Sequence, residues 1–149
     1  MDINSENAAS IDVSKVAFSK VNFSYPTRTD VQVLKSVSFD LNRGKTLALV
    51  GRSGSGKSTI ASLLMRFYAI ENGVVTVNKK PLSEIYLKAW LNALAFVPQD
   101  VLLFGGTIRE NIAYGDTKAW EEQIIEAAKQ ANALEFIQGF PEGLETTVG

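Results

Sequence analysis

Gly51-Arg52-Ser53-Gly54-Ser55-Gly56-Lys57-Ser58-Thr59 is the stretch that decides how this chain folds. It fits the pattern G-x-x-x-x-G-K-[ST], in which glycines let the backbone curl around phosphate oxygens. Lys57 supplies a charge for the β- and γ-phosphates, and the Ser58 hydroxyl is an oxygen ligand suited to Mg²⁺. A helix that begins near Gly56 adds the positive end of its dipole. The stretch therefore predicts a loop that binds a nucleoside triphosphate with magnesium.

The residues on either side of this loop fit the same interpretation. Residues 45–50 are short and apolar, which predicts a strand entering the loop, and residues 60–67 predict a helix leaving it. The alternative is a glycine-rich turn with a chance lysine. Because the motif requires a strand before it and a helix after it, these flanks favour the phosphate-binding loop.

Composition limits the remaining classes of protein. The chain has 149 residues and is 46% hydrophobic, which is enough for one soluble domain with a core. A net charge of −1 argues against broad attraction to nucleic acid, so we expect no nucleic-acid partner. There is no cysteine and no histidine, which excludes disulfides, thiolate metal sites and imidazole catalysis. No apolar run is long enough for a membrane helix, and the N-terminus lacks a signal-peptide pattern.

The chain before the loop predicts an antiparallel sheet. Residues 1–14 are polar and aperiodic, and we interpret them as a linker or tail. Alternating apolar residues predict a strand over about 16–25, with a bulge or turn at Ser19-Lys20 where the alternation changes parity. Residues 26–30 predict a turn, and residues 37–41 predict a half-buried strand.

The chain after the loop predicts further strands and helices. Residues 73–77 predict a strand, and the fully apolar residues 94–97 predict a strand buried in a parallel sheet. Residues 107–114 predict a short helix with Thr107 as its cap and Glu110 three residues on. A longer helix is expected to start near residue 116 and to place one face in the core. That face would carry Trp120, Ile124, Ala127, Ala128 and Ala131.

Four motifs in this order resemble the nucleotide-binding domain of ATP-binding-cassette (ABC) transporters. They lie at residues 23–26, 51–59, 96–99 and 103–115, and the last is similar to a stretch typical of exporters. The resemblance covers about residues 15–149, and its loop region is especially similar to bacterial lipid A exporters (MsbA-like half-transporters). It implies an α/β fold: a P-loop NTPase core of the ABC ATPase type with an N-terminal antiparallel β subdomain.

The resemblance also implies roles for individual residues, with ATP and Mg²⁺ as cofactors. Tyr25 would stack on adenine, although a tyrosine at a strand end could simply cover the core. Val33 would pack near the sugar and base, or be a plain strand residue. Gln99 would be the catalytic residue that positions Mg²⁺ and the attacking water, with an ordinary loop amide as the alternative; Ser58 and Gln99 would be the metal ligands. The ATP-binding residues would be Tyr25, Val33, Gly51, Arg52, Ser53, Gly54, Ser55, Gly56, Lys57, Ser58 and Thr59.

The resemblance stops before several motifs of such a domain. No L-S-G-G-Q occurs, and no apolar strand ending in Asp-Glu follows Gln99. We therefore expect residues 15–149 to be the N-terminal part of the domain, truncated before the signature helix and the Walker B strand, soluble and inactive as an ATPase by itself. The intact protein would hydrolyse ATP at the cytoplasmic face of a membrane to drive export of lipid or another hydrophobic substrate. Its partners would be a transmembrane domain and a second nucleotide-binding domain.

Two other functions are weighed against this one. Another P-loop enzyme is the first: a GTPase would carry an Asn-Lys-x-Asp motif and a small kinase an arginine-bearing lid, and neither is visible. A non-transport ABC-type module of DNA repair or chromosome structure is the second. Such modules break into a long coiled coil after the loop region, and no sustained heptad occurs here. The transporter ATPase is the favoured interpretation.

Overall fold

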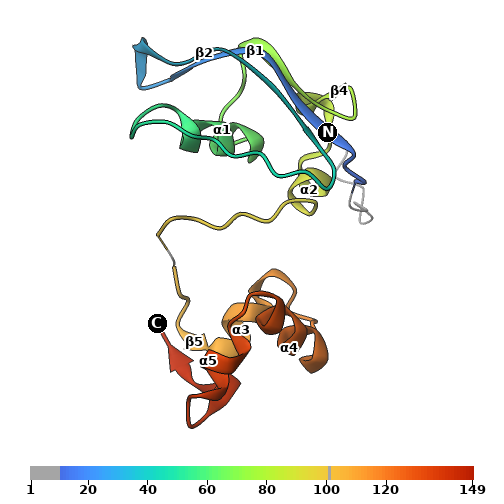
Figure 1. The fold of residues 1–149 in the computed structure, drawn as a ribbon, viewed down its shortest axis with the longest axis vertical. Coiled ribbons are helices and arrows are strands. Elements are labelled where there is room, and N and C mark those ends of the chain that lie inside the picture. The colour runs from blue at the N-terminus through green and yellow to red at the C-terminus, as the bar shows by residue number, and fades with distance from the viewer. Residues whose placement is uncertain (1–10, 101) are drawn as a thin grey trace, which may run out of the picture. The chain divides into compact units, whose positions relative to one another are not determined.

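The computed structural model describes residues 11–100 and 102–149, which fall into two units, Met1–Phe96 and Val97–Gly149 (Figure 1). Most of the predicted linker over residues 1–14 lies outside the described residues. Its described end packs against the first unit, because Ile11 and Val13 are half-buried against the core. The packed chain thus extends four residues before the predicted boundary at residue 15. Among the described residues, no helix combines the length and apolarity needed to cross a bilayer.

An antiparallel sheet with the strand order β2-β1-β3-β4 forms one side of the first unit. Its strands are β1 (Lys15–Tyr25), β2 (Arg28–Asn42), β3 (Asn72–Val77) and β4 (Lys80–Pro81). The helices of the unit are α1 (Lys57–Leu64), the 3₁₀ turn η1 (Leu82–Glu84) and α2 (Leu87–Leu91). Strand β2 begins nine residues before the predicted strand at residue 37, so the turn is only Pro26-Thr27.

The predicted bulge in β1 is confirmed. The register between β1 and β2 shifts between Phe18 and Val21, and Lys20 has a positive φ of 49°. The extra residue changes the parity of the strand, so that Phe18 and Val21 both point into the core. Gly73 in β3 faces this bulge, where a Cβ would collide with the backbone of Lys20. The bulge therefore explains both the broken alternation and the glycine opposite it.

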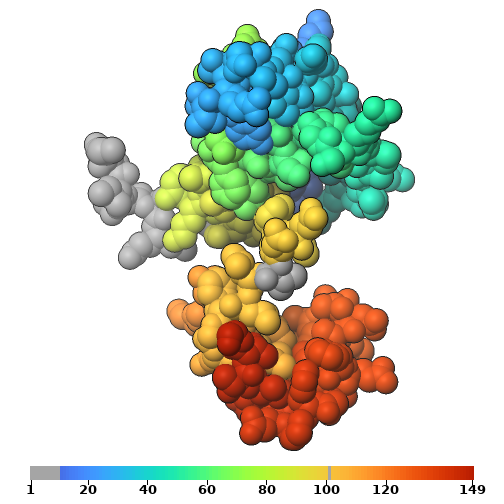
Figure 2. All heavy atoms as spheres, turned by 90° about the vertical axis from the view of Figure 1, so that its left-hand side faces the viewer, coloured from blue at the N-terminus to red at the C-terminus, as the bar shows by residue number. Residues whose placement is uncertain are grey.

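The core of the first unit lies between the sheet and α1. Figure 2 shows the blue atoms of the β1–β2 hairpin packed directly against the green atoms of the chain that follows it. Helix α1 contributes Ile60 and Leu63, at 7% and 0% exposed. Trp90 of α2 is 1% exposed, and its indole N–H donates to the carbonyl of Leu64 at 2.6 Å. The buried core residues are Val16, Phe18, Val21, Phe23, Leu34, Ile60, Leu63, Val75, Val77, Leu82 and Trp90.

Two predicted strands are wrong. Residues 45–50 and residues 94–97 form no strand, and both sheets of the described chain are antiparallel. Most of their apolar side chains are exposed, with Val50 at 92% and Val97 at 87%, while Leu94 is half-buried against the core. A strand exists only where neighbouring backbone accepts and donates its hydrogen bonds, and neither segment pairs with another among the described residues. The apolar composition indicated that these residues prefer burial, but it could not indicate whether a neighbouring strand is present to pair with them.

The second unit is built from short helices. Its elements are β5 (Gly106–Thr107), α3 (Ile108–Ile112), the 3₁₀ turn η2 (Ala113–Gly115), α4 (Glu121–Gln130), α5 (Leu134–Gln138), the 3₁₀ turn η3 (Gly143–Glu145) and β6 (Thr147–Val148). Strands β5 and β6 pair antiparallel. The predicted cap is confirmed: Thr107 Oγ1 accepts from the N–H of Glu110 at 3.1 Å, and Glu110 accepts from the N–H of Thr107 at 2.8 Å.

The prediction that Trp120 lies on the buried face of the long helix is wrong. The helix starts at Glu121 rather than near residue 116, and Trp120 is its N-cap with extended backbone. Asp116 instead begins a turn, because its carbonyl accepts from the N–H of Ala119 at 2.9 Å. Trp120 is 74% exposed, whereas Ile124 and Ala128 are buried as predicted. Ala127 and the C-cap Ala131 are exposed as well, so only Ile124 and Ala128 of the predicted face lie in the core.

An ion-pair cluster ties the second unit together. The guanidinium of Arg109 in α3 donates to Glu145 at 2.5 Å and to Glu121 at 3.5 Å. The hydrogen bond to Glu145 is the main reason why the pKa of Arg109 is raised above its ordinary value. Arg109 therefore stays cationic and links η3 and α4 to α3.

Candidate nucleotide-binding site

The glycine-rich loop lies between residue 50 and helix α1, and its backbone turns sharply. Gly54 and Gly56 have positive φ values of 80° and 91°. The N–H of Ser55 donates to the carbonyl of Arg52 at 3.2 Å, which closes the turn. Arg52, Ser53 and Ser55 are exposed. The loop thus has the curled, open backbone that its sequence predicts.

Two glycines of the loop also allow neighbouring side chains to lie close to the loop backbone. A Cβ on Gly56 would lie 2.6 Å from Cδ2 of Leu34 and 3.3 Å from Cγ1 of Val33, both in β2. A Cβ on Gly51 would lie 2.6 Å from Oγ of Ser55. Glycine at these positions therefore seats the end of the loop on the sheet and leaves its interior free of side chains.

The N-terminus of α1 has the features of an anion site. Its N-cap is Gly56, which makes no side-chain cap, and no acidic residue lies in the first turn. Helices usually begin with a Ser, Thr, Asp or Asn whose oxygen accepts from the first N–H groups. Without that oxygen, these N–H groups and the helix dipole are available to phosphate oxygens.

Lys57 is held across the loop by the loop itself. Its Nζ donates to the carbonyl oxygens of Gly51 and Arg52, both at 2.9 Å, and lies 3.4 Å from Oγ of Ser55. These bonds fix a full positive charge next to the uncapped helix end. The loop, the helix and the lysine together fit a polyphosphate in shape and in charge.

The donors available for magnesium are fewer. Ser58 is exposed in the first turn of α1, where its hydroxyl can serve as one hard oxygen ligand. No group of three acidic side chains that could hold a metal occurs among residues 11–100 and 102–149. These residues fit Mg²⁺ that is also coordinated by phosphate oxygens. Gln99, predicted as the second ligand, is exposed and belongs to the second unit, so its role stays a prediction.

The structure brings three further predicted residues to the start of α1. Tyr25 ends β1, and its hydroxyl forms a hydrogen bond of 2.8 Å with Oγ1 of Thr59. Thr59 lies in the first helical turn and is 3% exposed. Val33 is half-buried beside Gly56. All three therefore border the loop, and adenine stacking by Tyr25 and the sugar contact of Val33 stay predictions.

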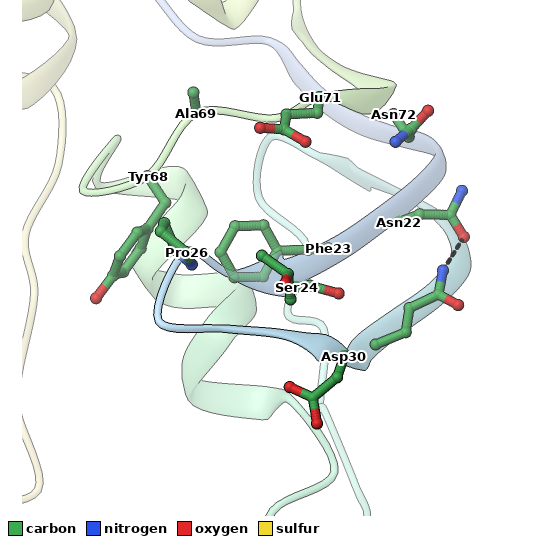
Figure 3. Close-up of a pocket in the computed structure, with 11 residues that line it drawn as sticks. Asn22, Phe23, Ser24, Pro26, Asp30, Tyr68, Ala69, Glu71 and Asn72 are labelled. Carbon is green, nitrogen blue, oxygen red and sulfur yellow. Dashed lines mark hydrogen bonds between the residues drawn. The ribbon is translucent and has the colours of Figure 1, made fainter.

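A separate hollow of about 690 Å³ lies beside the β1–β2 hairpin (Figure 3). None of the residues that line it belongs to the loop, so it is not the phosphate site. Phe23 and Tyr68, which line it, also contact the ring of Tyr25 edge-on, each with centroids 5.1 Å apart. Sequence reasoning missed Tyr68, since nothing in the local pattern places an aromatic residue after α1 beside the end of β1.

These features define the site of a P-loop nucleotide-binding protein, and the comparisons with known proteins give its family. The sequence profile of the family described as ABC transporter matches residues 34–144. The chain is 47% identical over 135 residues to ABC transporter B family member 4 of Dictyostelium discoideum, covering 91% of this chain and 18% of that protein. It is 48% identical over 136 residues to an ATP-dependent lipid A-core flippase of Pseudoalteromonas atlantica, covering 91% of this chain and 23% of the flippase.

A solved structure agrees with these matches. The chain superposes on a bacterial Atm1-family ABC exporter with ATP bound with a TM-score of 0.87 and 38% identity, covering 98% of this chain and 26% of the exporter. The chain belongs to the ABC transporter family and has the fold of its ATPase domain. It spans about a quarter or less of the length of these relatives.

Proposed function

We propose that this chain is the ATP-binding part of the motor domain of an ABC exporter. The observation that carries the proposal is Lys57, whose ammonium is fixed by two loop carbonyls next to a helix that begins without a side-chain cap. Tyr25, which contacts the first turn of the same helix, supplies a ring for adenine. The loop binds the phosphates, and Ser58 with Gln99 contributes ligands for Mg²⁺.

The intact protein binds and hydrolyses Mg-ATP to drive export across a membrane. The names of its relatives support this proposal, since they include a lipid A-core flippase and a multidrug transporter. A lipid or another hydrophobic molecule is the substrate class that these names favour. The partners are a transmembrane domain and a second nucleotide-binding domain, at the cytoplasmic face of the membrane. For the 149-residue chain alone we expect binding without rapid turnover.

Calorimetry with Mg-ATP tests the site. Lys57→Ala removes the charge that meets the phosphates and is expected to weaken binding by about 2–3 kcal/mol, as for a charge-assisted hydrogen bond. Lys80→Ala is the matched control, since Lys80 is an exposed lysine of β4 that makes none of the loop contacts. Equal affinities of Lys57→Ala and the wild type would refute the phosphate site. A phosphate-release assay with Lys57→Ala as background tests for turnover.

A further inference from the structure

The ring of Tyr25 is held by contacts from its own strand, from α1 and from the segment that follows α1. Its hydroxyl shares a hydrogen bond of 2.8 Å with Thr59 Oγ1 in the first turn of α1. Phe23 and Tyr68 pack against the ring at interplanar angles of 82° and 85°. The orientation of Tyr25 is therefore fixed before any ligand arrives.

Thr59 is a polar residue in a buried position. It is the buried polar residue of the first helical turn, at 3% exposed, and a β-branched residue lowers helix propensity. A buried hydroxyl needs a hydrogen-bond partner, and here the partner is the Tyr25 hydroxyl. Thr59 follows Lys57 and Ser58 directly, so the same helical turn carries the phosphate contacts and the contact to the ring.

We infer that Thr59 is a positioning residue for base recognition: its hydroxyl sets the Tyr25 ring in the orientation that stacks on the nucleotide base. This inference rests on the proposed nucleotide site and adds a residue that acts through Tyr25. A ring that is already ordered loses less conformational freedom on binding, which strengthens the complex. The hydrogen bond also fixes the distance between the ring and the phosphate loop. The base and the phosphates of one nucleotide therefore bind to groups whose separation is already set.

Two ligands separate this role from a merely structural one. Mg-ATP contains a base, and magnesium tripolyphosphate has the phosphates without it. Thr59→Val, which removes the hydroxyl at nearly constant shape, is expected to weaken Mg-ATP about threefold to tenfold, the range for ordering one side chain. Thr59 itself belongs to the proposed phosphate loop, so Thr59→Val is compared with the wild type on Mg-ATP alone. Thr59→Ser keeps the hydroxyl and is expected to restore ATP affinity.

Tyr25→Phe provides a second test, because it keeps the aromatic ring and removes only the hydroxyl that is bonded to Thr59. It is expected to weaken Mg-ATP binding as much as Thr59→Val does, to leave tripolyphosphate affinity unchanged, and to be no stronger a binder than the double variant, in which the same hydrogen bond is lost only once. Equal weakening of both ligands by Tyr25→Phe, or an ATP affinity unchanged by both single variants, would overturn the inference. Lys57→Ala is expected to weaken both ligands, and its failure to do so would instead overturn the phosphate site itself.

Discussion

Strand β1 and residues 45–50, which follow β2, contain similar apolar residues but differ in how deeply these residues are buried. Val21 in β1 is 0% exposed, while Val50 just before the loop is 92% exposed. Strand β1 is paired on both sides, by β2 and by β3, and covered by α1. Residues 45–50 have β-forming composition and no paired strand among the described residues. Apolar alternation becomes a strand only where the chain supplies both a partner strand and a covering layer.

The difference matters for function because, among the described residues, the loop contacts the sheet at its α1 end, while its Gly51 end is held by Lys57. Gly56 and Thr59 contact the sheet through Leu34 and Tyr25. Gly51, at the other end of the loop, follows the unpaired segment. The nucleotide site is therefore fixed through α1 and the β1–β2 hairpin rather than through the segment that leads into the loop.

The largest effect is expected for a pair of phenylalanines. Phe18 is 2% exposed and stacks on Phe39 with centroids 4.5 Å apart, whereas Phe96 is 52% exposed. Phe18→Ala should lower the free energy of unfolding by about 3–5 kcal/mol, because it leaves a cavity in the core. Phe96→Ala should cost less than about 1 kcal/mol. Urea unfolding followed by circular dichroism measures both, and comparable losses would contradict the difference between the two regions.

A pair of glycines tests the backbone of the same regions. Gly73 and Gly44 have positive φ values of 84° and 72°, but only at Gly73 would a Cβ meet neighbouring backbone. Gly44→Ala is expected to cost about 1–2 kcal/mol from its conformation alone. Gly73→Ala adds the collision with the bulge, for a total of about 2–5 kcal/mol. Gly73→Ala should therefore unfold at a lower urea concentration than Gly44→Ala. The opposite order would mean that the backbone of the bulge moves aside at little cost.

The smallest effect is expected for a pair of valines. Val21→Ala removes buried methyl groups and should cost about 2–3 kcal/mol. Val50→Ala should stay within about 0.5 kcal/mol, since its side chain is almost fully exposed. Thermal unfolding of the two variants is a sufficient measurement. A loss at Val50 as large as that at Val21 would show that residues 45–50 are packed in solution.

Features set by nearby residues were predictable from the sequence. The bulge at Lys20 appeared as a change of parity, and the cap at Thr107 as a threonine three residues before a glutamate. The loop was predictable because its chemistry needs particular residues at fixed spacing. Each of these features is decided within a few residues, where no distant partner is needed.

Features that depend on distant partners were not predictable. Residues 45–50 carry the composition of a buried strand, but strand formation depends on pairing that composition cannot report. Trp120 fits a helical period that begins only after it. The hydrogen bond between Tyr25 and Thr59 joins residues 34 positions apart, and no local pattern indicates it. The two wrongly predicted strands and the missed contact have one cause, namely that side-chain and strand partners are chosen in three dimensions.

Asn78 has a mechanical consequence for the point where the chain enters the sheet. Its side-chain oxygen accepts from the backbone N–H groups of Ser14 and Lys15, and its amide donates to the carbonyl of Asp12 at 2.7 Å. Tension applied to the chain ahead of β1 would thus reach the β3–β4 turn before it reached the strand. Strand β1 lies between two antiparallel neighbours, so a pull along it would load many hydrogen bonds in shear. A pull on the chain ahead of β1 would therefore be shared by the strands on both sides of it.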